Sequence, residues 1–403
     1  MIASTVRRLL WVRGLRAFAD GYVSLVLPVY LIALGLSPLD IGVIATATLL
    51  GSAALSVLVG LHAHRIGYRT LLLGAAVLMA ATGFSFAALT DFWPLLIVAI
   101  VGTLNPSSGD VSVFLPLEQA LLAQAAADNE RTALFARYSV VGALVGAVGA
   151  LFAGAPELLA QKMAIGVKPA LQAMFALYGV LGLVAGLIYW RLPHERAPKE
   201  RARAAPLGKS RRIVFTLAGL FSLDAFGGGF VVQSMLALWL FERFQLSTAV
   251  AGTIFFWSGV FSAVSYLVAV RIAKRIGLVN TMVFTHLPAN VLLLLMPFVP
   301  DLTWVIVLLL VRSALSQMDV PTRGSYVMAV VTPAERPAAA SVTSVPRSLA
   351  SAVSPLLAGF LLGISTFGWP LLIAGAVKIA YDLSLLATFR AVRPPEEKPE
   401  AAL

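Results

Sequence analysis

The sequence has no cysteine and few charged residues for its length. None of its 403 residues is a cysteine, and Asp, Glu, Lys and Arg together make up 12%. The missing cysteines exclude disulfide bonds and thiolate metal sites. A water-soluble domain carries about 25% charged residues. The shortage of charge, together with a mean hydropathy of +0.90, therefore excludes an ordinary soluble domain.

The sequence also lacks the short motifs of common catalytic and nucleotide-binding sites. It contains no G-x4-GK[ST] loop, no H-E-x-x-H and no paired-cysteine metal motif. The chain thus lacks the usual means of hydrolysing ATP. We expect no enzyme, no metal site and no cofactor, and we expect a proton gradient or the gradient of a solute to supply the driving force.

Long apolar runs recur along the whole chain. A segment of about 20 apolar residues spans the hydrocarbon core of a bilayer, which is about 30 Å thick. The sequence therefore predicts an all-α polytopic membrane protein whose surroundings are the lipid bilayer. The twelve expected spans are 12–34, 38–60, 70–89, 93–124, 133–154, 171–191, 212–240, 247–270, 279–299, 302–331, 337–362 and 368–389.

The formal net charge of +11 is distributed unevenly between the loops. If the N-terminus is cytoplasmic, twenty-two of the 30 Lys and Arg residues fall on the cytoplasmic side, against only Lys162, Lys168 and Arg243 on the other. The positive-inside rule then places both termini in the cytoplasm, and we expect a bacterial cytoplasmic membrane. Because the excess charge reflects topology, it argues against a nucleic-acid partner.

The chain repeats itself. "LSPLDIGVIA" at 36–45 matches "LSTAVAGTIF" at 246–255, and "AHRIGYR" at 63–69 matches "AKRIGLV" at 273–279, both with an offset of 210 residues. The repeat makes the first span part of the fold and not a cleaved signal peptide. We expect an N-terminal six-helix bundle (1–191), a cytoplasmic linker (192–211), a C-terminal six-helix bundle (212–392) and a disordered cytoplasmic tail (393–403). Two parallel six-helix halves are a known transporter plan.

The loop "GLHAHRIGYR" (60–69) resembles the signature G-x-L-A-D-R-x-G-R-K of the major facilitator superfamily. The matching residues are Gly60, Ala63, Arg65, Gly67 and Arg69, while His64 departs from the family's acidic residue. "SPLLAG" (354–359) resembles a degenerate form of the family's glycine–proline motif. The resemblance implies a two-bundle fold, solute transport by alternating access, and a cytoplasmic gate that includes Arg65 and Arg69. It also implies that spans one, four, seven and ten line the central cavity.

Most ionisable residues inside the spans fall on those four helices. A charge in the bilayer interior is costly unless it is paired or hydrated, so each one needs a partner or a function. In the fourth span, Pro106, Gly109 and Pro116 weaken the backbone hydrogen bonding, and we expect a continuous kinked helix that lines the cavity. The expected substrate and ion pathway consists of Asp20, Asn105, Asp110, Asp224, Arg312, Asp319 and Arg347.

Two residues of opposite charge stand at equivalent positions of the repeat. Asp319-Val-Pro321-Thr-Arg323 corresponds to Phe114-Leu-Pro116-Leu-Glu118, so Glu118 is the counterpart of Arg323. The two residues suit a cytoplasmic gate that pairs when that side closes, or a permanent ion pair that holds the halves together. The repeat also aligns the first and seventh spans, where Ala17-Phe18 corresponds to Ala225-Phe226.

Two arginines near the membrane midplane, Arg312 and Arg347, point to the substrate. A guanidinium grips a carboxylate or phosphate through paired hydrogen bonds, so these residues suit a small polar or anionic solute. Alternatively, they are counterions for Asp20, Asp224 or Asp319. We further interpret Lys378 and Asp382 as a structural pair on one helix. For His286 we favour a packed histidine beside Pro288 over the alternative of a proton site.

The sequence thus predicts a monomeric secondary transporter for a small-molecule substrate. The expected coupling is to protons through a buried carboxylate, with Asp20 the first candidate and Asp224 and Asp319 behind it. The expected direction is export. An uncoupled facilitator and a membrane sensor that does not transport are the alternatives.

Overall fold

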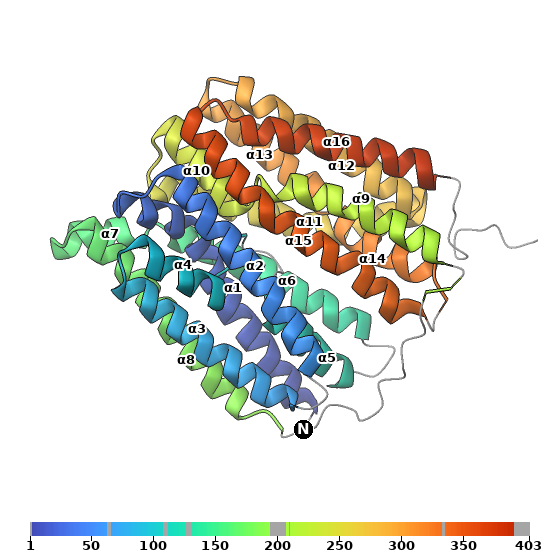
Figure 1. Ribbon diagram of the computed structural model, residues 1–403, viewed down its shortest axis with the longest axis horizontal. Coiled ribbons are helices and arrows are strands. Elements are labelled where there is room, and N and C mark those ends of the chain that lie inside the picture. The colour runs from blue at the N-terminus through green and yellow to red at the C-terminus, as the bar shows by residue number, and fades with distance from the viewer. Residues whose placement is uncertain are drawn as a thin grey trace, which may run out of the picture. The chain divides into compact units, whose positions relative to one another are not determined.

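The computed structural model describes residues 2–62, 66–107, 112–125, 131–193, 207–208, 210–332 and 335–390, which form helices and no strands (Figure 1). Eleven spans in this part of the chain are long and apolar enough to cross a membrane. The predicted all-α membrane fold is confirmed. In the first half of the chain the helices are α1 (Ile2–Ala33), α2 (Pro38–His62), α3 (Tyr68–Ala88), α4 (Phe92–Val101), α5 (Phe114–Ala125), α6 (Arg131–Phe152), α7 (Ala155–Met163) and α8 (Val167–Trp190).

The second half of the chain follows the same plan. Its helices are α9 (Arg211–Gly229), α10 (Gln233–Phe244), α11 (Thr248–Ile276), α12 (Leu278–Leu295), the 3-10 turn η1 (Met296–Phe298), α13 (Leu302–Ser316), α14 (Asp319–Ala329), α15 (Arg336–Ile364) and α16 (Trp369–Phe389). Most ends lie within a few residues of the expected spans. Spans four, seven and ten are each divided into two helices, and the short helix α7 was not expected.

The chain forms two compact units, whose boundaries differ from those of the two sequence halves. Unit 1 contains residues 1–199, 232–260 and 355–366, and unit 2 contains residues 200–231, 261–354 and 367–403. Unit 1 therefore includes α10, the first part of α11 and the end of α15 in addition to the first-half helices. The expected division into two six-helix bundles joined by the 192–211 linker follows from the sequence repeat and stays a prediction.

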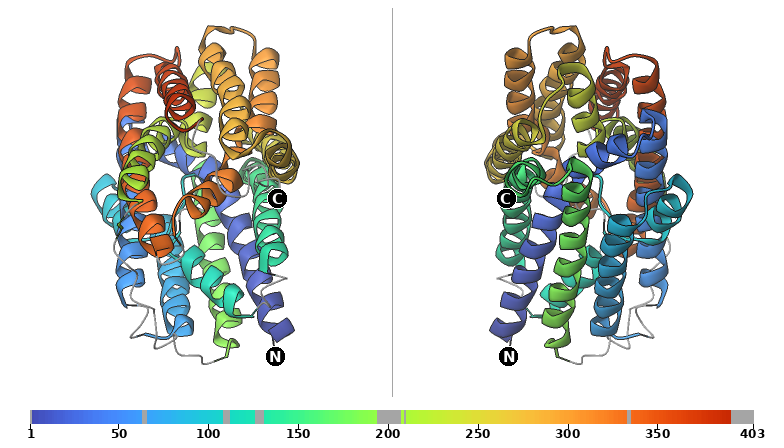
Figure 2. Two further views of the ribbon diagram at one scale, coloured as in Figure 1. Left: turned by 90° about the vertical axis from the view of Figure 1, so that its right-hand side faces the viewer. Right: turned by 90° about the vertical axis from the view of Figure 1, so that its left-hand side faces the viewer.

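Helix α1 packs along α6 and α8 in unit 1, and α3 packs along α8. Figure 2 shows α1 beside α6 in both views. The approach is close because glycines face the neighbouring backbone. A Cβ added to Gly21 would lie 2.1 Å from the carbonyl oxygen of Gly146, and one added to Gly149 would lie 2.1 Å from that of Phe18. Small residues at such crossings allow the helix axes to come together.

The second-half helices of unit 1 are joined to the first-half helices by similar close contacts. A Cβ on Gly42 of α2 would lie 2.5 Å from the carbonyl oxygen of Pro355 in α15, and one on Gly359 would lie 2.3 Å from that of Pro38. The backbone N–H of Leu356 donates to Thr46 Oγ1 at 2.9 Å. These contacts fasten the last part of α15 to α2.

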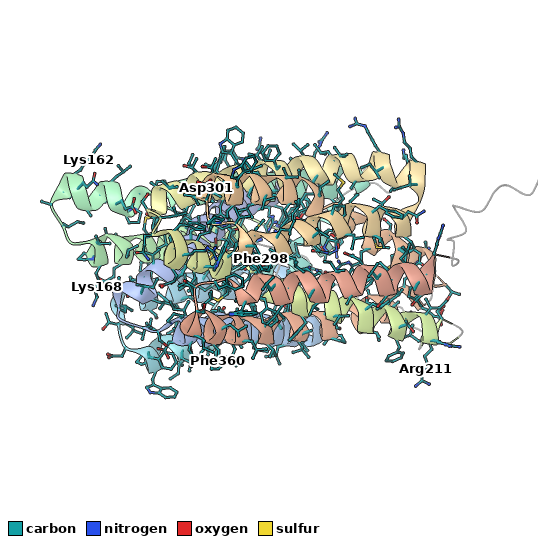
Figure 3. The ribbon with its side chains drawn as sticks, turned by 90° about the horizontal axis from the view of Figure 1, so that it is seen from above. Lys162, Lys168, Arg211, Phe298, Asp301 and Phe360 are labelled. Atoms are coloured by element: carbon teal, nitrogen blue, oxygen red, sulfur yellow. The ribbon has the colours of Figure 1, made fainter. Side chains whose placement is uncertain are left out.

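Helix α7 provides a further link within unit 1. The chain turns back from α7 into α8 between Lys162 and Lys168, which both lie at the end of unit 1 drawn at the left of Figure 3. The Glu157 carboxylate of α7 accepts a hydrogen bond from the backbone N–H of Thr248 at 2.6 Å. This N–H belongs to the first turn of α11, where backbone donors lack helical partners, so the acid stabilises that helix end.

The expectation of a continuous kinked helix in span four is wrong. Helix α4 ends at Val101 and α5 begins at Phe114, so the described residues between them are not helical. Their polar groups have partners instead: Tyr178 donates to the Thr103 carbonyl at 2.9 Å, and Ser107 donates to Asn105 Oδ1 through both N–H and Oγ–H. Irregular backbone at membrane depth is tolerated only where protein or water supplies such partners.

The break in span four meets the break in span seven. The Pro106 carbonyl accepts a hydrogen bond of 3.0 Å from the backbone N–H of Ser234, in the first turn of α10. This bond satisfies one of the N–H groups that a helix start leaves unpaired. Two interruptions that each expose backbone therefore satisfy each other inside unit 1.

Unit 2 is held by an apolar core between α9, α12, α14 and α16. Fully buried members include Leu217, Met282, Tyr326 and Tyr381. Arg211 at the start of α9 and Asp301 before α13 lie towards opposite ends of this unit (Figure 3). Two members of this core, Phe221 and Tyr381, lie against the Arg323 guanidinium.

Glu335 lies outside the membrane-spanning helices and anchors the end of the linker in unit 2. Its carboxylate accepts hydrogen bonds from Gly208 N–H at 2.5 Å, Ser210 Oγ at 2.8 Å and Thr332 Oγ1 at 2.8 Å. The bonds from Gly208, Ser210 and Thr332 stabilise the ionised form and lower the pKa of Glu335 to about 2. The carboxylate thus ties the linker to the turn between α14 and α15.

Candidate functional site

Glu118 in unit 1 lies in a fully enclosed set of donors. Its carboxylate accepts hydrogen bonds from Arg16 at 2.5 Å, from Tyr189 at 2.5 Å and from Tyr138. Its side chain has no exposed surface. An acid in such a place is stable only if it is paired and hydrogen-bonded, and here the partners come from α1, α6 and α8.

Arg16 is a functional-site residue that the sequence reasoning missed, because it was counted with the cytoplasmic loop charges. Its side chain is 2% exposed, stacks over the Phe114 ring at 4.2 Å and donates to Ser112 Oγ at 3.3 Å. Two features of the sequence could have identified Arg16 as a site residue. It stands one helical turn before Asp20, and the repeat aligns it with Asp224.

Asp20, the first candidate for the proton site, is buried in unit 1. Its side chain lies within electrostatic range of Arg16, Tyr22 and Tyr178. Arg16 stands one helical turn earlier on the same helix, α1. Whether Asp20 binds a proton during transport stays a prediction.

Unit 2 contains a larger set of buried charges around Asp224 of α9. Its Oδ2 accepts from Arg323 at 2.8 Å, and its Oδ1 accepts from Lys378 Nζ at 2.6 Å. Arg323 also pairs with Asp319, one turn away on α14. The structure therefore brings together two expected pathway residues, Asp224 and Asp319, with the expected gate residue Arg323.

The interpretation of Lys378 and Asp382 as a pair is wrong. Lys378 bonds Asp224, while Asp382 Oδ1 lies 2.9 Å from His286 Nδ1 and Asp382 Oδ2 accepts from Asn290 Nδ2 at 2.8 Å. His286 Nε2 lies 3.8 Å from Asp224 Oδ1. His286 is thus more than a packed side chain, because it lies between two carboxylates and connects Asp382 to the charges around Asp224.

Arg312 and Arg347 differ from the two paired cations Arg323 and Lys378. Neither makes a hydrogen bond or ion pair with another residue in the described part of the chain, and Arg312 Nε is buried without a partner. Both lie within electrostatic range of Asp224. Arg312 is half-buried and Arg347 is exposed, so neither is a hydrogen-bonded counterion of the acids.

The remaining expected site residues are scattered. Asn105 is buried in the break of span four, and Arg69 lies over the Trp190 ring at 5.5 Å. Arg65 and Asp110 fall outside the described residues. The pathway and gate assignments for these four residues stay predictions.

The two charge clusters occupy equivalent positions in the repeat with their signs exchanged. Arg16 aligns with Asp224, and Glu118 aligns with Arg323. Each unit pairs its two residues, Arg16 with Glu118 and Arg323 with Asp224. The same backbone positions of spans one and four, or seven and ten, thus carry a buried ion pair in each half of the chain.

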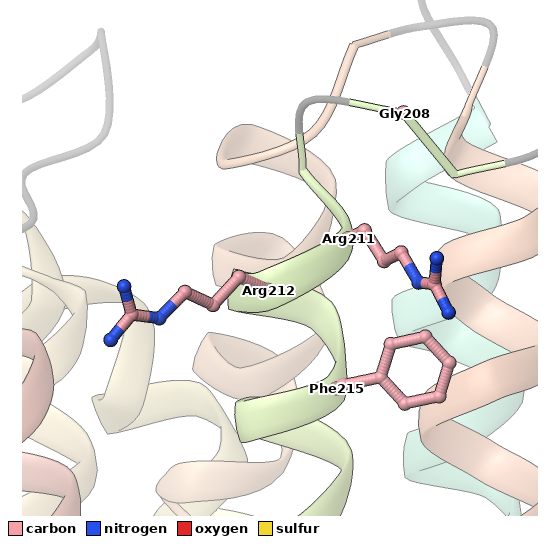
Figure 4. A pocket seen from close by; sticks show the side chains of 4 residues that line it. All are labelled: Gly208, Arg211, Arg212 and Phe215. Atoms are coloured by element: carbon pink, nitrogen blue, oxygen red, sulfur yellow. The ribbon is translucent and has the colours of Figure 1, made fainter.

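A surface hollow of about 500 Å³ lies at the start of α9 and is lined by Gly208, Arg211, Arg212 and Phe215. Figure 4 shows Arg211 and Phe215 extending to one side of the helix and Arg212 to the other. The Arg211 guanidinium lies 5.8 Å from the Phe215 ring centre. This hollow contains none of the expected pathway residues.

Comparison with known proteins supports a transporter. The model of the Major Facilitator Superfamily matches the chain over residues 9–223 and again over 217–403. The uncharacterized membrane protein YJR124C of Saccharomyces cerevisiae is 24% identical over 426 residues, with coverage of 97% of this chain and 95% of that protein.

Solved structures show the same fold. The nucleoside transporter NupG matches with a TM-score of 0.73 at 14% identity, covering 96% of this chain and 99% of that chain. The human organic anion transporter MFSD10 matches with a TM-score of 0.67 at 17% identity, covering 95% and 99%. Since the family model covers nearly the whole chain, the protein belongs to the major facilitator superfamily of membrane transporters.

Proposed function

We propose that the protein is a proton-coupled secondary transporter that exports a small polar or anionic solute by alternating access. The observation that carries the proposal is the buried cluster of Asp224, Arg323, Lys378, His286 and Asp382 in unit 2. Ionisable side chains inside a membrane are costly and mark substrate or ion pathways. A neutral apolar solute requires no such set.

The anionic class of the solute rests on Arg312 and Arg347. Within the described structure, both guanidiniums have no hydrogen-bonded acid, and one Nε atom is buried without an acceptor. A carboxylate or phosphate supplies the acceptors that a guanidinium prefers. MFSD10, a fold relative, is described as an organic anion transporter, which makes organic anions a reasonable first set of compounds.

The coupling proton is proposed to bind a buried acid, for which Asp20 is the candidate carried forward from the sequence.

The gate interpretation of Glu118 and Arg323 requires that both residues leave their present partners in another access state. Reversing the charge of each and then of both tests it in transport assays. Restoration by the double reversal supports a gate, and failure of restoration argues that each residue serves its own cluster.

We further propose that the protein is a monomer in a bacterial cytoplasmic membrane with both termini inside. The charge asymmetry of the loops supports the orientation. Reporter fusions to the 192–211 linker and the C-terminus test it, and a linker outside the cell overturns it. Right-side-out and inverted vesicles test the direction of transport.

A two-step experiment tests the proposed function. The purified protein is first screened by thermal shift against carboxylates, phosphates and neutral nucleosides, and each stabilising compound is then tested for flux in proteoliposomes with an imposed pH gradient. We expect an anion to bind and its accumulation to require the gradient. Flux that ignores the gradient indicates a facilitator, and binding without flux indicates a sensor. Arg312→Gln and Arg347→Gln should weaken anion binding.

A further inference from the structure

The sequence favoured simple packing over proton binding for His286, and the structure places it between two carboxylates. It lies on α12, is 4% exposed, and has a carboxylate at each ring nitrogen: Asp382 Oδ1 at 2.9 Å from Nδ1 and Asp224 Oδ1 at 3.8 Å from Nε2. Histidine is the side chain whose ordinary titration falls near neutral pH. A buried imidazole between two acids is therefore built for proton binding.

The hydrogen bonds of Asp382 determine which ring nitrogen is free to accept a proton. An ionised carboxylate only accepts hydrogen bonds. His286 Nδ1 lies 2.9 Å from Asp382 Oδ1 and 3.1 Å from Asn290 Nδ2, which donates to Asp382 Oδ2 at 2.8 Å. Because Oδ1 can only accept, the shorter contact takes its hydrogen from Nδ1. With Nδ1 protonated, the neutral ring has its lone pair on Nε2, which faces Asp224. Asp382 is thus a positioning residue.

Charged groups surround Asp224, which faces Nε2 of His286. The hydrogen-bonded cluster contains three acids, Asp224, Asp319 and Asp382, and two cations, Arg323 and Lys378. A ring protonated at both nitrogens has a carboxylate facing each N–H group, Asp382 at Nδ1 and Asp224 at Nε2. The other polar groups that face it are Tyr381 of α16, whose ring centre is 6.1 Å from that of His286, and Arg312 and Arg347, which act on Asp224 through space.

We propose that His286 Nε2 binds a proton that the transporter couples to solute movement, with Asp382 fixing the tautomer and Asp224 facing the added proton. The inference rests on the proposed proton coupling and adds a site in unit 2 to the Asp20 candidate in unit 1. On protonation, the Nε2 lone pair forms an N–H bond and the ring becomes a cation. On release, the proton returns to water and no other bond changes. Lys378 competes for Asp224 Oδ1, at 2.6 Å, so movement of Lys378 changes how strongly Nε2 holds the proton.

Nitrogen NMR of the imidazole groups in nanodiscs tests the site with the proton itself as the probe. The chain has four histidines, and His286→Gln identifies the resonance of interest. We expect Nδ1 to carry hydrogen throughout and Nε2 to become protonated as the pH is lowered across the range in which transport responds to pH. Asp382→Asn should change the tautomer, whereas His194→Gln, the control, should not affect the His286 signal. An Nε2–H tautomer at high pH, or no protonation across that range, overturns the proposal.

The functional test measures transport in proteoliposomes, with an anion found by the thermal-shift screen as the solute. His286→Gln should lose accumulation driven by a pH gradient while retaining exchange of labelled for unlabelled solute. Retention of gradient-driven accumulation by a folded His286→Gln variant also overturns the proposal. A protein that protonates at Nε2 but shows no gradient-driven flux in the wild type contradicts the proposed transport function and leaves the proton site intact. The two failures are thus distinguishable.

Discussion

The two buried charge clusters use equivalent backbone positions but differ in their donors. In unit 1, Glu118 is held by a guanidinium and two phenol groups, which keep their protons at physiological pH. In unit 2, Asp224 is held by Arg323 and Lys378 and connects through His286 to Asp382. The second cluster contains a histidine and the first does not, so equivalent positions of the repeat are surrounded by different kinds of donor.

The largest effect should follow from removing the charge of Glu118. Glu118→Gln removes the acid to which Arg16 is hydrogen-bonded, and breaking a buried ion pair in this way costs about 3–5 kcal/mol. Chemical denaturation in detergent should show that loss of stability. Arg16→Met combined with Glu118→Gln should recover part of it, because the guanidinium that lost its hydrogen-bonded acid is then also removed. A Glu118→Gln protein as stable as the wild type would contradict the structural role given to unit 1.

Removing the charge of Asp224 should lower the stability less than removing the charge of Glu118, and it should impair transport more. In Asp224→Asn, Arg323 keeps its pair with Asp319, so only Lys378 loses its acid partner. We expect a loss of about 1–3 kcal/mol, in the range for a buried group left without its partner, and a loss of transport. Lys378→Met in the same chain should restore stability without restoring transport. If transport returns with stability, the unit 2 cluster is also structural.

Asp20→Asn and His286→Gln compare the two proposed proton sites. Asp20→Asn keeps the shape and polarity of the side chain but removes its titration. We expect both variants to bind solute and to lose accumulation driven by a pH gradient, while the His286 nitrogen signal of Asp20→Asn titrates as in the wild type. Proteoliposome flux and NMR of the same preparations measure the two properties. Wild-type accumulation by Asp20→Asn would leave proton coupling to unit 2 alone.

The smallest effect is expected at Glu335, which lies outside both clusters. Its pKa is about 2 in the folded protein against an ordinary value of 4.5. A lowered folded-state pKa adds stability above the unfolded value, and this contribution is lost as the pH falls towards 2. Glu335→Gln should therefore lower the melting temperature slightly at pH 7, and the difference from the wild type should shrink between about pH 4.5 and pH 2. A difference that does not depend on pH would contradict the assignment.

The sequence was sufficient to predict the helices because span length depends on local composition. The apolar runs and the repeat placed most helix ends within a few residues. The break in span four was not predictable from them, because it depends on distant partners: Pro106 accepts from Ser234, and Thr103 accepts from Tyr178. Proline and glycine indicated a weak helix there, and only tertiary hydrogen bonds decide whether it bends or opens.

The identities of the charged site residues were also readable, but their pairings were not. A charge in an apolar span is visible in the sequence, which is how Asp224, Asp319 and Arg323 were found. Pairing depends on how each helix is rotated and on rotamers, so Lys378 meets Asp224 across helices and does not meet Asp382 on its own helix. Arg16 was missed because its distance from the membrane centre could not be told from the loop charges beside it.

The glycine contact between α2 and α15 allows these two helices to pack closely. A methyl group on Gly42 would collide with the Pro355 carbonyl only while these helices touch, since the calculated separation of 2.5 Å exists only in this arrangement. The cost of Gly42→Ala therefore falls on one access state and not on a state in which the helices separate. A few kcal/mol applied to one of two states is enough to reverse their populations. The absence of side chains at Gly42 and Gly359 thus permits the conformation in which α2 and α15 touch. The single methyl group of Gly42→Ala should favour a conformation in which they are apart.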